Sequence, residues 1–301
     1  MLAIIEALRP NQWIKNLSLF AAAILTGQLF NHRIFNASLL AFISFCVLSS
    51  SSYLVNDLLD IDKDRLHPVK KYRPLARGAI SKNTSLFVAL FLTILGLFIA
   101  FSINSAFFII ALVFIFMQYS YSLFIKKKAL IDIVSIAFFF ILRTYAGEIA
   151  TGFHLPIWIT LTVIFLALFI ASGKRRSELY LSGKSTRKAL EGYSKSLLNF
   201  YTTIFAVCTL ISYAMFTFLA EKVSFDGIIH EFLLTNFPAA LDRKWWMVTL
   251  MPVILGIMRY GQIIFEMQEG ERPERVVATD IPLLGSVLLW GMMIITIIYV
   301  L

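Results

Sequence analysis

Residues 52–78 read SYLVNDLLDIDKDRLHPVKKYRPLARG, an apolar run that continues into four aspartates and then into a series of basic residues. On a helix, Asn56, Asp60 and Asp64 recur every four residues and share one face. Asp57 lies three residues before Asp60 and joins that face. Like charges at this spacing repel one another, so a helix with this face requires cations that neutralise it.

The oxygen atoms on this face are suited to a magnesium ion. Carboxylates and amide carbonyls are hard ligands, and magnesium is usually held by one or two carboxylates together with substrate phosphates. The predicted metal ligands are Asn56, Asp57, Asp60 and Asp64, whereas Asp62 points away from the face. The basic residues that follow, Lys70, Arg73 and Arg77, are of the type that contacts phosphate oxygens. The stretch therefore indicates a magnesium–diphosphate site at a membrane surface.

Two other interpretations of the aspartates stay open. The acids could pair with the neighbouring bases on a solvated loop, which would make them a structural network. A calcium loop agrees less well with the sequence, because the glycine expected within such a loop is missing.

The composition predicts a membrane protein. The chain has 301 residues, 59% of them hydrophobic and 15% charged, and its mean hydropathy is +0.80. A soluble domain of this size needs more polar surface. Since a spanning helix needs about 20 largely apolar residues, nine stretches qualify: 15–31, 36–58, 83–103, 105–124, 131–151, 155–173, 198–220, 246–267 and 281–301. The alternating pattern of barrel strands is absent. We expect an all-α polytopic bundle of nine transmembrane helices in a single membrane domain, residues 1–301.

The net charge of +9 is concentrated on one face of the membrane. The loops after every second span contain Lys63, Arg65, Lys70, Lys71, Arg73, Arg77, Lys82, Lys126–Lys128, Lys174–Arg176, Lys184, Arg187, Lys188, Lys195, Arg272 and Arg275. The opposite loops contain only Arg33, Lys222, Arg243 and Lys244. The positive-inside rule predicts a cytoplasmic N-terminus, and nine spans then leave the C-terminus outside the inner (cytoplasmic) membrane. Many of these bases would contact membrane lipid headgroups, and no nucleic acid is expected as a partner.

Three further segments carry polar side chains on the predicted cytoplasmic side. RPNQWIKN contains Lys15 and Asn16, YSLFIKKKALID contains Tyr121, Lys126 and Asp132, and SGKRRSEL contains Lys174 and Arg175. Eleven residues after Asp132, on the same helical face, Arg143 lies inside a predicted span. An arginine there usually faces a polar cavity, although a structural pair with Glu148 or Asp132 is the alternative. The four histidines are scattered without metal-ligand spacing, so zinc is not expected.

These segments resemble the UbiA superfamily of intramembrane prenyltransferases, whose N-D-x-x-D-x-x-x-D motif ends the second span. RPNQWIKN, HPVKKYRPLARG, GKRRSEL and PERVVATDIPLL are similar to one branch, the decaprenyl-phosphate phosphoribosyltransferases. The resemblance covers residues 9 to about 284. It implies an enzyme that transfers 5-phosphoribose from phosphoribosyl diphosphate to a polyprenyl phosphate, releases diphosphate and uses Mg²⁺ in bacterial cell-wall glycan (arabinan) precursor synthesis. A homo-oligomer is compatible with this resemblance.

The resemblance also implies roles for individual residues. The catalytic set would be Asp57, Asp60, Asp64, Lys126 and Asp132. The substrate-binding set would be Lys15, Asn16, Asn56, Lys70, Arg73, Arg77, Tyr121, Arg143, Lys174 and Arg175. One departure matters: superfamily members usually carry a second D-x-x-x-D, whereas here Asp132 is followed four residues later by Ile136.

The sequence leaves two alternatives to this function. The first is a prenyltransferase of the same fold that joins an isoprenoid diphosphate to an aromatic or other acceptor. The reduced second motif and the many loop cations favour a ribosyl donor. The second is a secondary transporter, which would place ionisable residues in the middle of broken helices in both halves of the chain. Because the polar residues gather at one face, transport is disfavoured.

Overall fold

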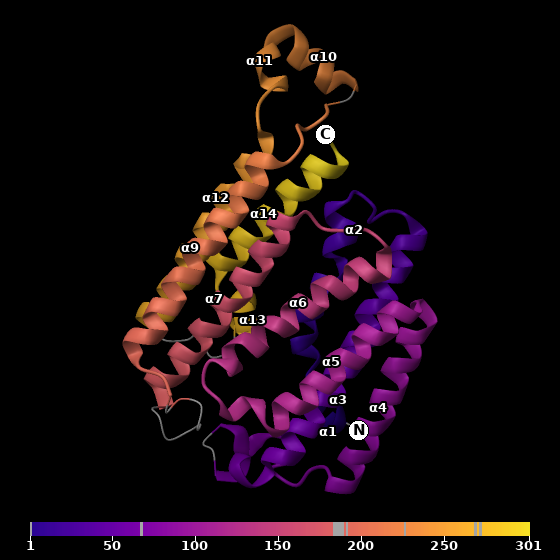
Figure 1. Cartoon of the computed structure of the whole chain (residues 1–301), viewed down its shortest axis with the longest axis vertical. Helices are drawn as coiled ribbons and strands as arrows, with labels where there is room; N and C mark the ends of the chain where they lie inside the picture. Colours follow the sequence, from indigo (N-terminus) through magenta and orange to yellow (C-terminus); the bar gives the residue numbers. More distant parts are fainter. Residues whose placement is uncertain are drawn as a thin grey trace. The chain divides into compact units, whose positions relative to one another are not determined.

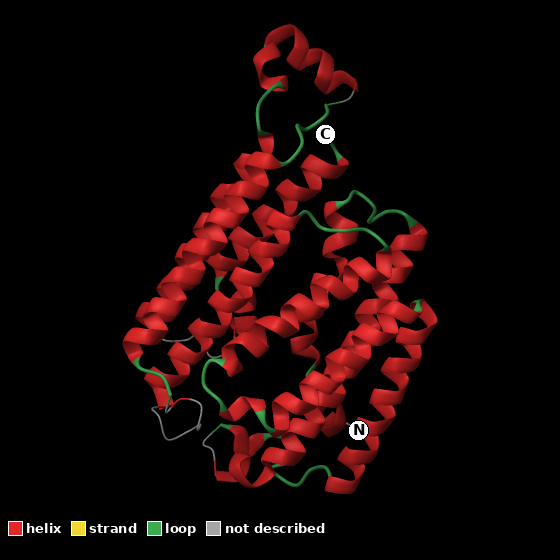
Figure 2. Ribbon diagram, in the orientation of Figure 1, coloured by secondary structure: helices red, strands yellow, loops and turns green. Residues whose placement is uncertain are grey.

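The computed structural model describes residues 2–66, 69–182, 190, 192–225, 227–267, 270 and 273–301. Within these residues every regular element is a helix, and Figure 2 shows them in red with no strand among the described parts. The all-α prediction is confirmed. Lys184, Arg187, Lys188 and Arg272, which were counted among the loop cations, lie outside the described residues.

The chain divides into two compact units, and each is described by itself. Unit 1 contains residues 1–23 and 28–154, and unit 2 contains residues 24–27 and 155–301. A single domain over residues 1–301 stays a prediction.

Unit 1 is a bundle whose longest member carries the aspartate motif. Its elements are α1 (Leu2–Leu8), η1 (Pro10–Phe20), α3 (His32–Leu66), η2 (Lys70–Tyr72), α4 (Lys82–Ile103), α5 (Ser105–Leu123), η3 (Ile125–Lys127) and α6 (Ile131–Thr151). In Figure 1, α3, α4, α5 and α6 lie side by side. Phe45, Phe107 and Phe114 form the buried aromatic centre. Small side chains bring α3 against α4, where Ser44 Oγ donates to the Gly96 carbonyl at 2.8 Å.

The helix boundaries in unit 1 follow capping residues. Ser81 accepts a hydrogen bond from the Thr84 amide at 3.0 Å and starts α4. Asn104 accepts one from the Phe107 amide at 2.7 Å and starts α5 directly after α4 ends. Serine and asparagine satisfy the free amides of a first helical turn, and this explains why the apolar stretch from residue 82 to residue 123 is two helices rather than one.

Unit 2 is a second set of long helices. Its elements are α7 (Ile157–Ser182), α9 (Lys195–Leu219), α10 (Gly227–Asn236), α11 (Pro238–Leu241), η5 (Trp245–Thr249), α12 (Leu250–Gln262), the π-helix η6 (Ile263–Met267), α13 (Pro273–Thr279) and α14 (Ile281–Tyr299). The long helix α7 packs along α9, and α12 packs on α14. The core includes Phe169, Tyr260 and Ile264. In Figure 1 the short helices α10 and α11 extend beyond the ends of α9 and α14.

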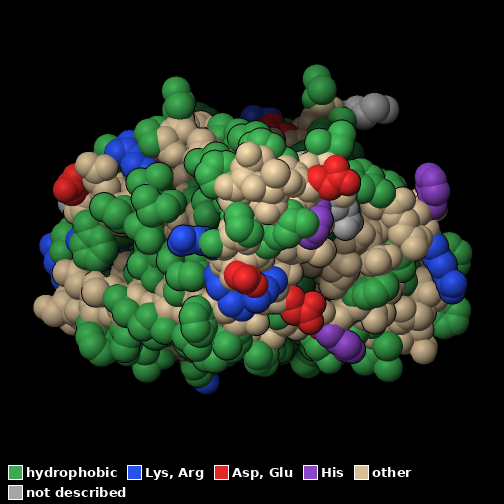
Figure 3. Space-filling view, turned by 90° about the horizontal axis from the view of Figure 1, so that it is seen from above, with side chains coloured by type: hydrophobic (Ala, Val, Ile, Leu, Met, Phe, Trp, Pro, Cys, Tyr) green, Lys and Arg blue, Asp and Glu red, His purple; other side chains and the backbone are tan. Residues whose placement is uncertain are grey.

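Eight helices in the described residues are long and apolar enough to cross a membrane. They are His32–Leu66, Lys82–Ile103, Ser105–Leu123, Ile131–Thr151, Ile157–Leu181, Lys195–Leu219, Trp245–Met267 and Ile281–Tyr299. The first of the nine expected spans, 15–31, is not among them, so the count of nine is not confirmed. That stretch lies in η1 and in the short helix α2 (Ala21–Leu25). On the face drawn in Figure 3, hydrophobic side chains are widely spread and charged side chains form only a few small groups.

The stretch η1 runs antiparallel along α3. Trp13 Nε1 donates to Ser50 Oγ at 3.0 Å, and Asn16 Nδ2 donates to Cys46 Sγ at 3.2 Å. Further along, the Phe20 ring lies 5.9 Å from the Phe42 ring, measured between centroids. Each step forward along η1 therefore meets a residue further back along α3.

Candidate active site

Two aspartates at the end of α3 are buried and share one arginine. Asp57 is 1% exposed and Asp64 is 4% exposed. Arg73 Nη1 donates to Asp57 Oδ1 at 3.0 Å and to Asp64 Oδ2 at 2.6 Å. Arg9 Nη2 donates to the same Asp57 Oδ1 at 2.5 Å. The two carboxylates are thus close enough to be bridged, and two guanidinium groups neutralise them.

The third aspartate and the motif's asparagine share a lysine. Lys126 Nζ donates to Asp60 Oδ2 at 2.5 Å and to Asn56 Oδ1 at 3.0 Å. The ammonium group therefore lies where two oxygen atoms of the predicted metal set converge. The side chain of Asp62 is 91% exposed and contacts only Arg65, at 3.9 Å, among the described ion pairs. The exposed side of α3 thus holds Asp62, as the helical spacing predicts.

Short segments between the long helices carry the cations to these acids. Arg73 directly follows the 3₁₀ turn η2, and Lys126 lies within the 3₁₀ turn η3. Arg9 has a left-handed backbone with φ of 53° at the start of η1, directly before Pro10, and its guanidinium stacks over the Tyr53 ring at 5.2 Å. A left-handed conformation is uncommon for a residue other than glycine, and here it turns the chain beside α3.

The acid cluster fits a divalent cation by its chemistry and by one orphaned atom. Asp57 Oδ2 is buried and accepts no hydrogen bond from the described residues. A buried carboxylate oxygen without a donor is costly, and a metal ion would satisfy it. No group of three or more His, Cys, Asp or Glu side chains in the described residues is arranged to hold a metal by itself. Magnesium usually takes one or two carboxylates and completes its shell with phosphate and water, so it would need the substrate in addition to these side chains.

A second polar group lies on α6. Tyr121 donates from its hydroxyl to Asp132 Oδ1 at 2.6 Å, and Asp132 is fully buried. Deeper in the same helix, Arg143 is 3% exposed. Its Nε donates to Asn16 Oδ1 at 2.7 Å, and its Nη1 donates to the Phe139 carbonyl at 2.8 Å.

The alternative of a structural ion pair for Arg143 is wrong for the described residues. Glu148 contacts His154 Nδ1 at 3.1 Å, and Asp132 contacts Tyr121. The Arg143 guanidinium instead lies 4.9 Å from the Phe114 ring centroid and 5.8 Å from that of Phe140. Its described partners are all uncharged.

Three other predicted residues of unit 1 have different surroundings, and of these Lys70 interacts electrostatically with the Asp64 carboxylate. Lys15 Nζ donates to Gln12 Oε1 at 3.2 Å. Lys70 is exposed on η2. Arg77 Nη2 donates to Glu6 Oε2 at 2.6 Å, and both side chains are about half exposed. Their phosphate-binding roles stay predictions.

The cations predicted on α7 belong to unit 2. Lys174 is half-buried, whereas Arg175 is fully buried and pairs with Glu178. The neighbouring Arg176 is also buried: its Nε donates to Asn199 Oδ1 at 2.7 Å and its Nη1 to the Ile264 carbonyl at 2.6 Å. Its guanidinium carbon lies 4.4 Å from the Tyr180 ring centroid and 4.1 Å from that of Phe265. Arg176 thus ties the end of α7 to the π-helix, where backbone carbonyls leave the α-helical pattern.

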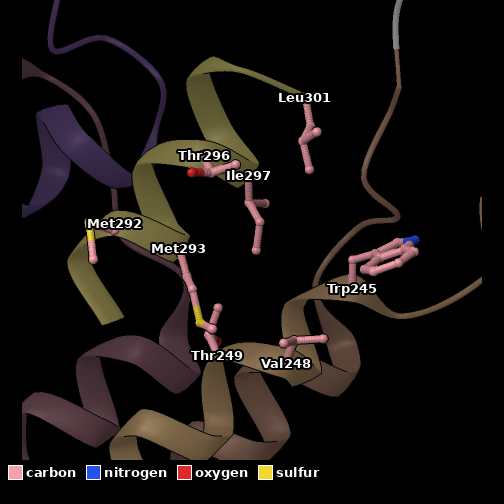
Figure 4. A pocket seen from close by; sticks show the side chains of 8 residues that line it. All are labelled: Trp245, Val248, Thr249, Met292, Met293, Thr296, Ile297 and Leu301. Carbon is pink, nitrogen blue, oxygen red and sulfur yellow. The ribbon is translucent and has the colours of Figure 1, made fainter. Parts of the chain in front are cut away.

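A cavity of about 210 Å³ in unit 2 is not a phosphate site. Figure 4 shows its lining, which comes from η5, α14 and the last residue of the chain: Trp245, Val248, Thr249, Met292, Met293, Thr296, Ile297 and Leu301. None of these side chains carries a charge. The Thr249 hydroxyl is already bonded to the Trp246 carbonyl and to the Tyr213 hydroxyl. The cavity offers an apolar surface only.

The sequence missed some contacts of this site. Arg9 is absent from the residues predicted for the site, although it binds Asp57 across 48 positions of sequence. The signal that could have found it is the arginine directly before Pro10 at the start of an apolar stretch. Arg176 was noted only as a loop cation, and its aromatic partner Phe265 lies too far along the chain to be anticipated.

A family model described as the UbiA prenyltransferase family matches residues 17–279. The chain belongs to the UbiA prenyltransferase family. As a UbiA-family member it is an enzyme and an integral membrane protein. Among its relatives, the decaprenyl-phosphate phosphoribosyltransferase of Mycolicibacterium smegmatis is 34% identical over 284 residues, 92% of this chain and 86% of that one. The enzyme of the same name from Corynebacterium glutamicum is 32% identical over 98% of this chain and 86% of its own length.

The UbiA fold is also seen in a solved structure. A UbiA homologue from Archaeoglobus fulgidus bound to GPP and Mg²⁺ has a TM-score of 0.73 to this chain at 22% identity, covering 99% of this chain and all of the other. This likeness confirms the expected UbiA fold.

Proposed function

We propose that this UbiA-family enzyme transfers 5-phosphoribose from phosphoribosyl diphosphate to a polyprenyl phosphate of decaprenyl type, releasing diphosphate. Two relatives that match most of the chain carry the name decaprenyl-phosphate phosphoribosyltransferase. The reaction would take place at the cytoplasmic face of the inner membrane and supply a precursor of bacterial cell-wall glycan.

One observation carries this proposal: three cations from separate segments converge on three of the four aspartates of α3, Asp57, Asp60 and Asp64. Arg9, Arg73 and Lys126 each lie within 3.0 Å of a carboxylate oxygen. Carboxylates alone would suit a metal, and cations alone would suit a phosphate. The two together suit a diphosphate that arrives with a divalent cation, because each partner then finds the opposite charge.

The residues present can support this transfer chemically. The bond between ribose C1 and the diphosphate oxygen breaks, and its electron pair stays on the diphosphate. Arg9, Arg73 and Lys126 are placed to stabilise the charge that develops there. An oxygen of the acceptor phosphate forms the new bond to C1. That oxygen is already anionic, so the step needs no strong general base.

The metal would be Mg²⁺, held by Asn56, Asp57, Asp60 and Asp64 in part or in full. The orphaned Asp57 Oδ2 supports this assignment, as does the Mg²⁺ in the Archaeoglobus fulgidus homologue. When bound, the ion would neutralise the diphosphate and make it a better leaving group.

A membrane assay tests the proposal. Membranes that contain the chain are given radiolabelled phosphoribosyl diphosphate with a polyprenyl phosphate and, in parallel, a prenyl diphosphate with 4-hydroxybenzoate. We expect a labelled lipid in the first mixture and no prenylated 4-hydroxybenzoate in the second. The labelled lipid should be absent after a chelator is added and in the Asp60→Asn variant. Product from the prenyl diphosphate alone would reject the proposal and establish the alternative prenyltransferase.

A further inference from the structure

Arg143 is the buried cation of unit 1 that the aspartate cluster does not use. It is 3% exposed, and among the described residues of unit 1 it is the only buried lysine or arginine. Its described partners are the Asn16 amide oxygen, the Phe139 carbonyl and the Phe114 and Phe140 rings. None of them carries a negative charge.

Such a side chain is expensive inside a membrane protein. A buried charge is tolerated when an opposite charge or a polar cavity compensates it. Two other arginines of the chain have a carboxylate as partner: Arg259 Nη2 lies 2.8 Å from Asp280 Oδ2, and Arg175 pairs with Glu178. Arg176 has uncharged partners too, but it lies in unit 2, where it binds the backbone of the π-helix.

Two hydrogen bonds hold the guanidinium of Arg143 in a fixed orientation. Asn16 fixes Nε and the Phe139 carbonyl fixes Nη1, while Nη2 has no acceptor among the described residues. Asn16 is itself held by Cys46 at 3.2 Å. A guanidinium group has five N–H donors, and these contacts use two of them. The free edge can therefore donate to a planar or tetrahedral anion through two parallel bonds.

The described contacts of Arg143 differ from those of the aspartate cluster. Through Asn16 it is linked to Cys46, which lies eleven residues before Asp57 on α3. The cations of the cluster bind the aspartates, whereas Arg143 binds none of them among the described residues. An anion bound by Arg143 would therefore be a second group, in addition to the diphosphate proposed for the aspartates.

We propose that Arg143 binds a phosphate monoester. This inference rests on the proposed function, in which each substrate carries one phosphate monoester and the donor carries the diphosphate as well. The two sources are the 5-phosphate of the ribosyl donor and the phosphate of the acceptor lipid. Both present a dianionic tetrahedral group to the free edge of the guanidinium, and the experiment distinguishes them.

The experiment measures thermal unfolding of the purified full chain in detergent. The ligands are ribose 5-phosphate and farnesyl phosphate, with ribose and farnesol as uncharged controls and magnesium diphosphate as a reference. One monoester should raise the melting temperature of the wild type while its uncharged control does not. Arg143→Gln should weaken binding of that monoester at least tenfold and leave the response to magnesium diphosphate intact. Ribose 5-phosphate as the active ligand assigns the donor, and farnesyl phosphate assigns the acceptor.

Two further variants keep the test decisive. Arg259→Gln removes an arginine from another span and should leave the monoester response unchanged. If Arg143→Gln does not fold, Arg143→Lys takes its place. Lysine keeps the charge but lacks the planar guanidinium that donates two parallel hydrogen bonds, so this variant should still bind the monoester more weakly than the wild type. Equal monoester responses in the wild type and the Arg143 variants, or no response in the wild type, would overturn the inference. Failure of the proposed function shows separately, as absence of ribosyl transfer by wild-type membranes.

Discussion

At the scale of single residues, the aspartates of α3 differ by their surroundings. Asp57 and Asp64 are buried and Asp60 is bound by Lys126, whereas Asp62 is almost fully exposed. The four side chains have the same chemistry and lie within eight positions. Their environments therefore predict different consequences for the same substitution.

Asp60→Asn and Asp64→Asn should each lower turnover by roughly a hundredfold or more, because each removes a charge that, in the proposed function, holds the metal and its diphosphate. Asp62→Asn should change turnover by less than about threefold, since surface substitutions away from a site have small effects. The assay is ribosyl transfer in membranes with matched amounts of folded protein. If Asp62→Asn were as inactive as Asp60→Asn, the active face of α3 would be wrongly assigned.

Spacing within one helix could be read from the sequence, and contacts between helices could not. The four-residue interval placed Asp60 and Asp64 on one face and Asp62 off it. The partners Arg9 and Lys126 reach the motif across 48 and 66 positions, and no local rule predicts such distances. Arg143 shows the same limit: its depth in a span was evident, but its link to Asn16 depends on how η1 packs.

At the scale of elements, η1 depends on a glycine of α6. A Cβ atom added at Gly147 would lie 2.3 Å from the Leu19 carbonyl oxygen, which is backbone and cannot rotate away. The close approach of η1 to α6 therefore requires the absence of a side chain at this position.

Gly147→Ala should lower the melting temperature of the purified protein, because the overlap forces η1 away from α6 at a cost of about 1–3 kcal/mol or more. Gly285→Ala is the matched control. Gly285 lies in α14 with no atom within 4 Å of the added carbon, so alanine should leave stability unchanged or raise it. Equal melting temperatures for the two variants would contradict the packing of η1.

The start of α14 combines a cap with an ion pair. Asp280 accepts a hydrogen bond from the Leu283 amide at 3.0 Å and three from Arg259, two of them from Nε and one from Nη2. The hydrogen bonds from the Arg259 guanidinium hold the pKa of the Asp280 carboxyl below its usual value. A lowered folded-state pKa means that this stabilisation is present above the ordinary aspartate pKa of about 3.9 and is lost as the pH falls through the folded value.

Asp280→Asn should therefore be less stable than the wild type between about pH 5 and pH 7, with the difference disappearing at lower pH. Asparagine retains the cap, so the change isolates the charge. Thermal unfolding across this pH range measures it. In an Arg259→Gln background the same substitution should have little pH-dependent effect, and a persistent difference there would point to the cap instead.

At the scale of the whole molecule, the number of membrane crossings depends on residues 10–25. Eight long helices are evident, and η1 is not one of them. Yet η1 follows α3 from the region of Asp57 back to Phe42 and Phe35. At about 2.0 Å per residue for a 3₁₀ helix and 1.5 Å for an α-helix, η1 and α2 together reach about 30 Å, the thickness of a bilayer core.

We therefore predict that residues 10–25 cross the membrane and that the N-terminus and residues 60–82 lie on the cytoplasmic side. Cysteines introduced as Leu2→Cys and Lys71→Cys should resist an impermeant reagent applied to intact cells, and Glu231→Cys on α10 should react. Both protected positions should become reactive once the membrane is permeabilised. Labelling of Leu2→Cys from outside would contradict a crossing by residues 10–25 and would leave the eight long helices as the only spans among the described residues.

The ion pairs at the end of α3 predict that a metal ion and a diphosphate bind together. Arg9, Arg73 and Lys126 already neutralise the carboxylates, so a metal ion alone would have to separate an ion pair and leave its cation without an anion. A diphosphate alone would meet cations that are already paired. With both ligands present, the cations could bind the phosphates and the carboxylates could bind the metal, so that every charge would have a partner of opposite sign. Each ligand should then bind poorly by itself, and the apparent Kd for Mg²⁺ should fall as diphosphate is added. Calorimetric titration in either order would show this mutual dependence.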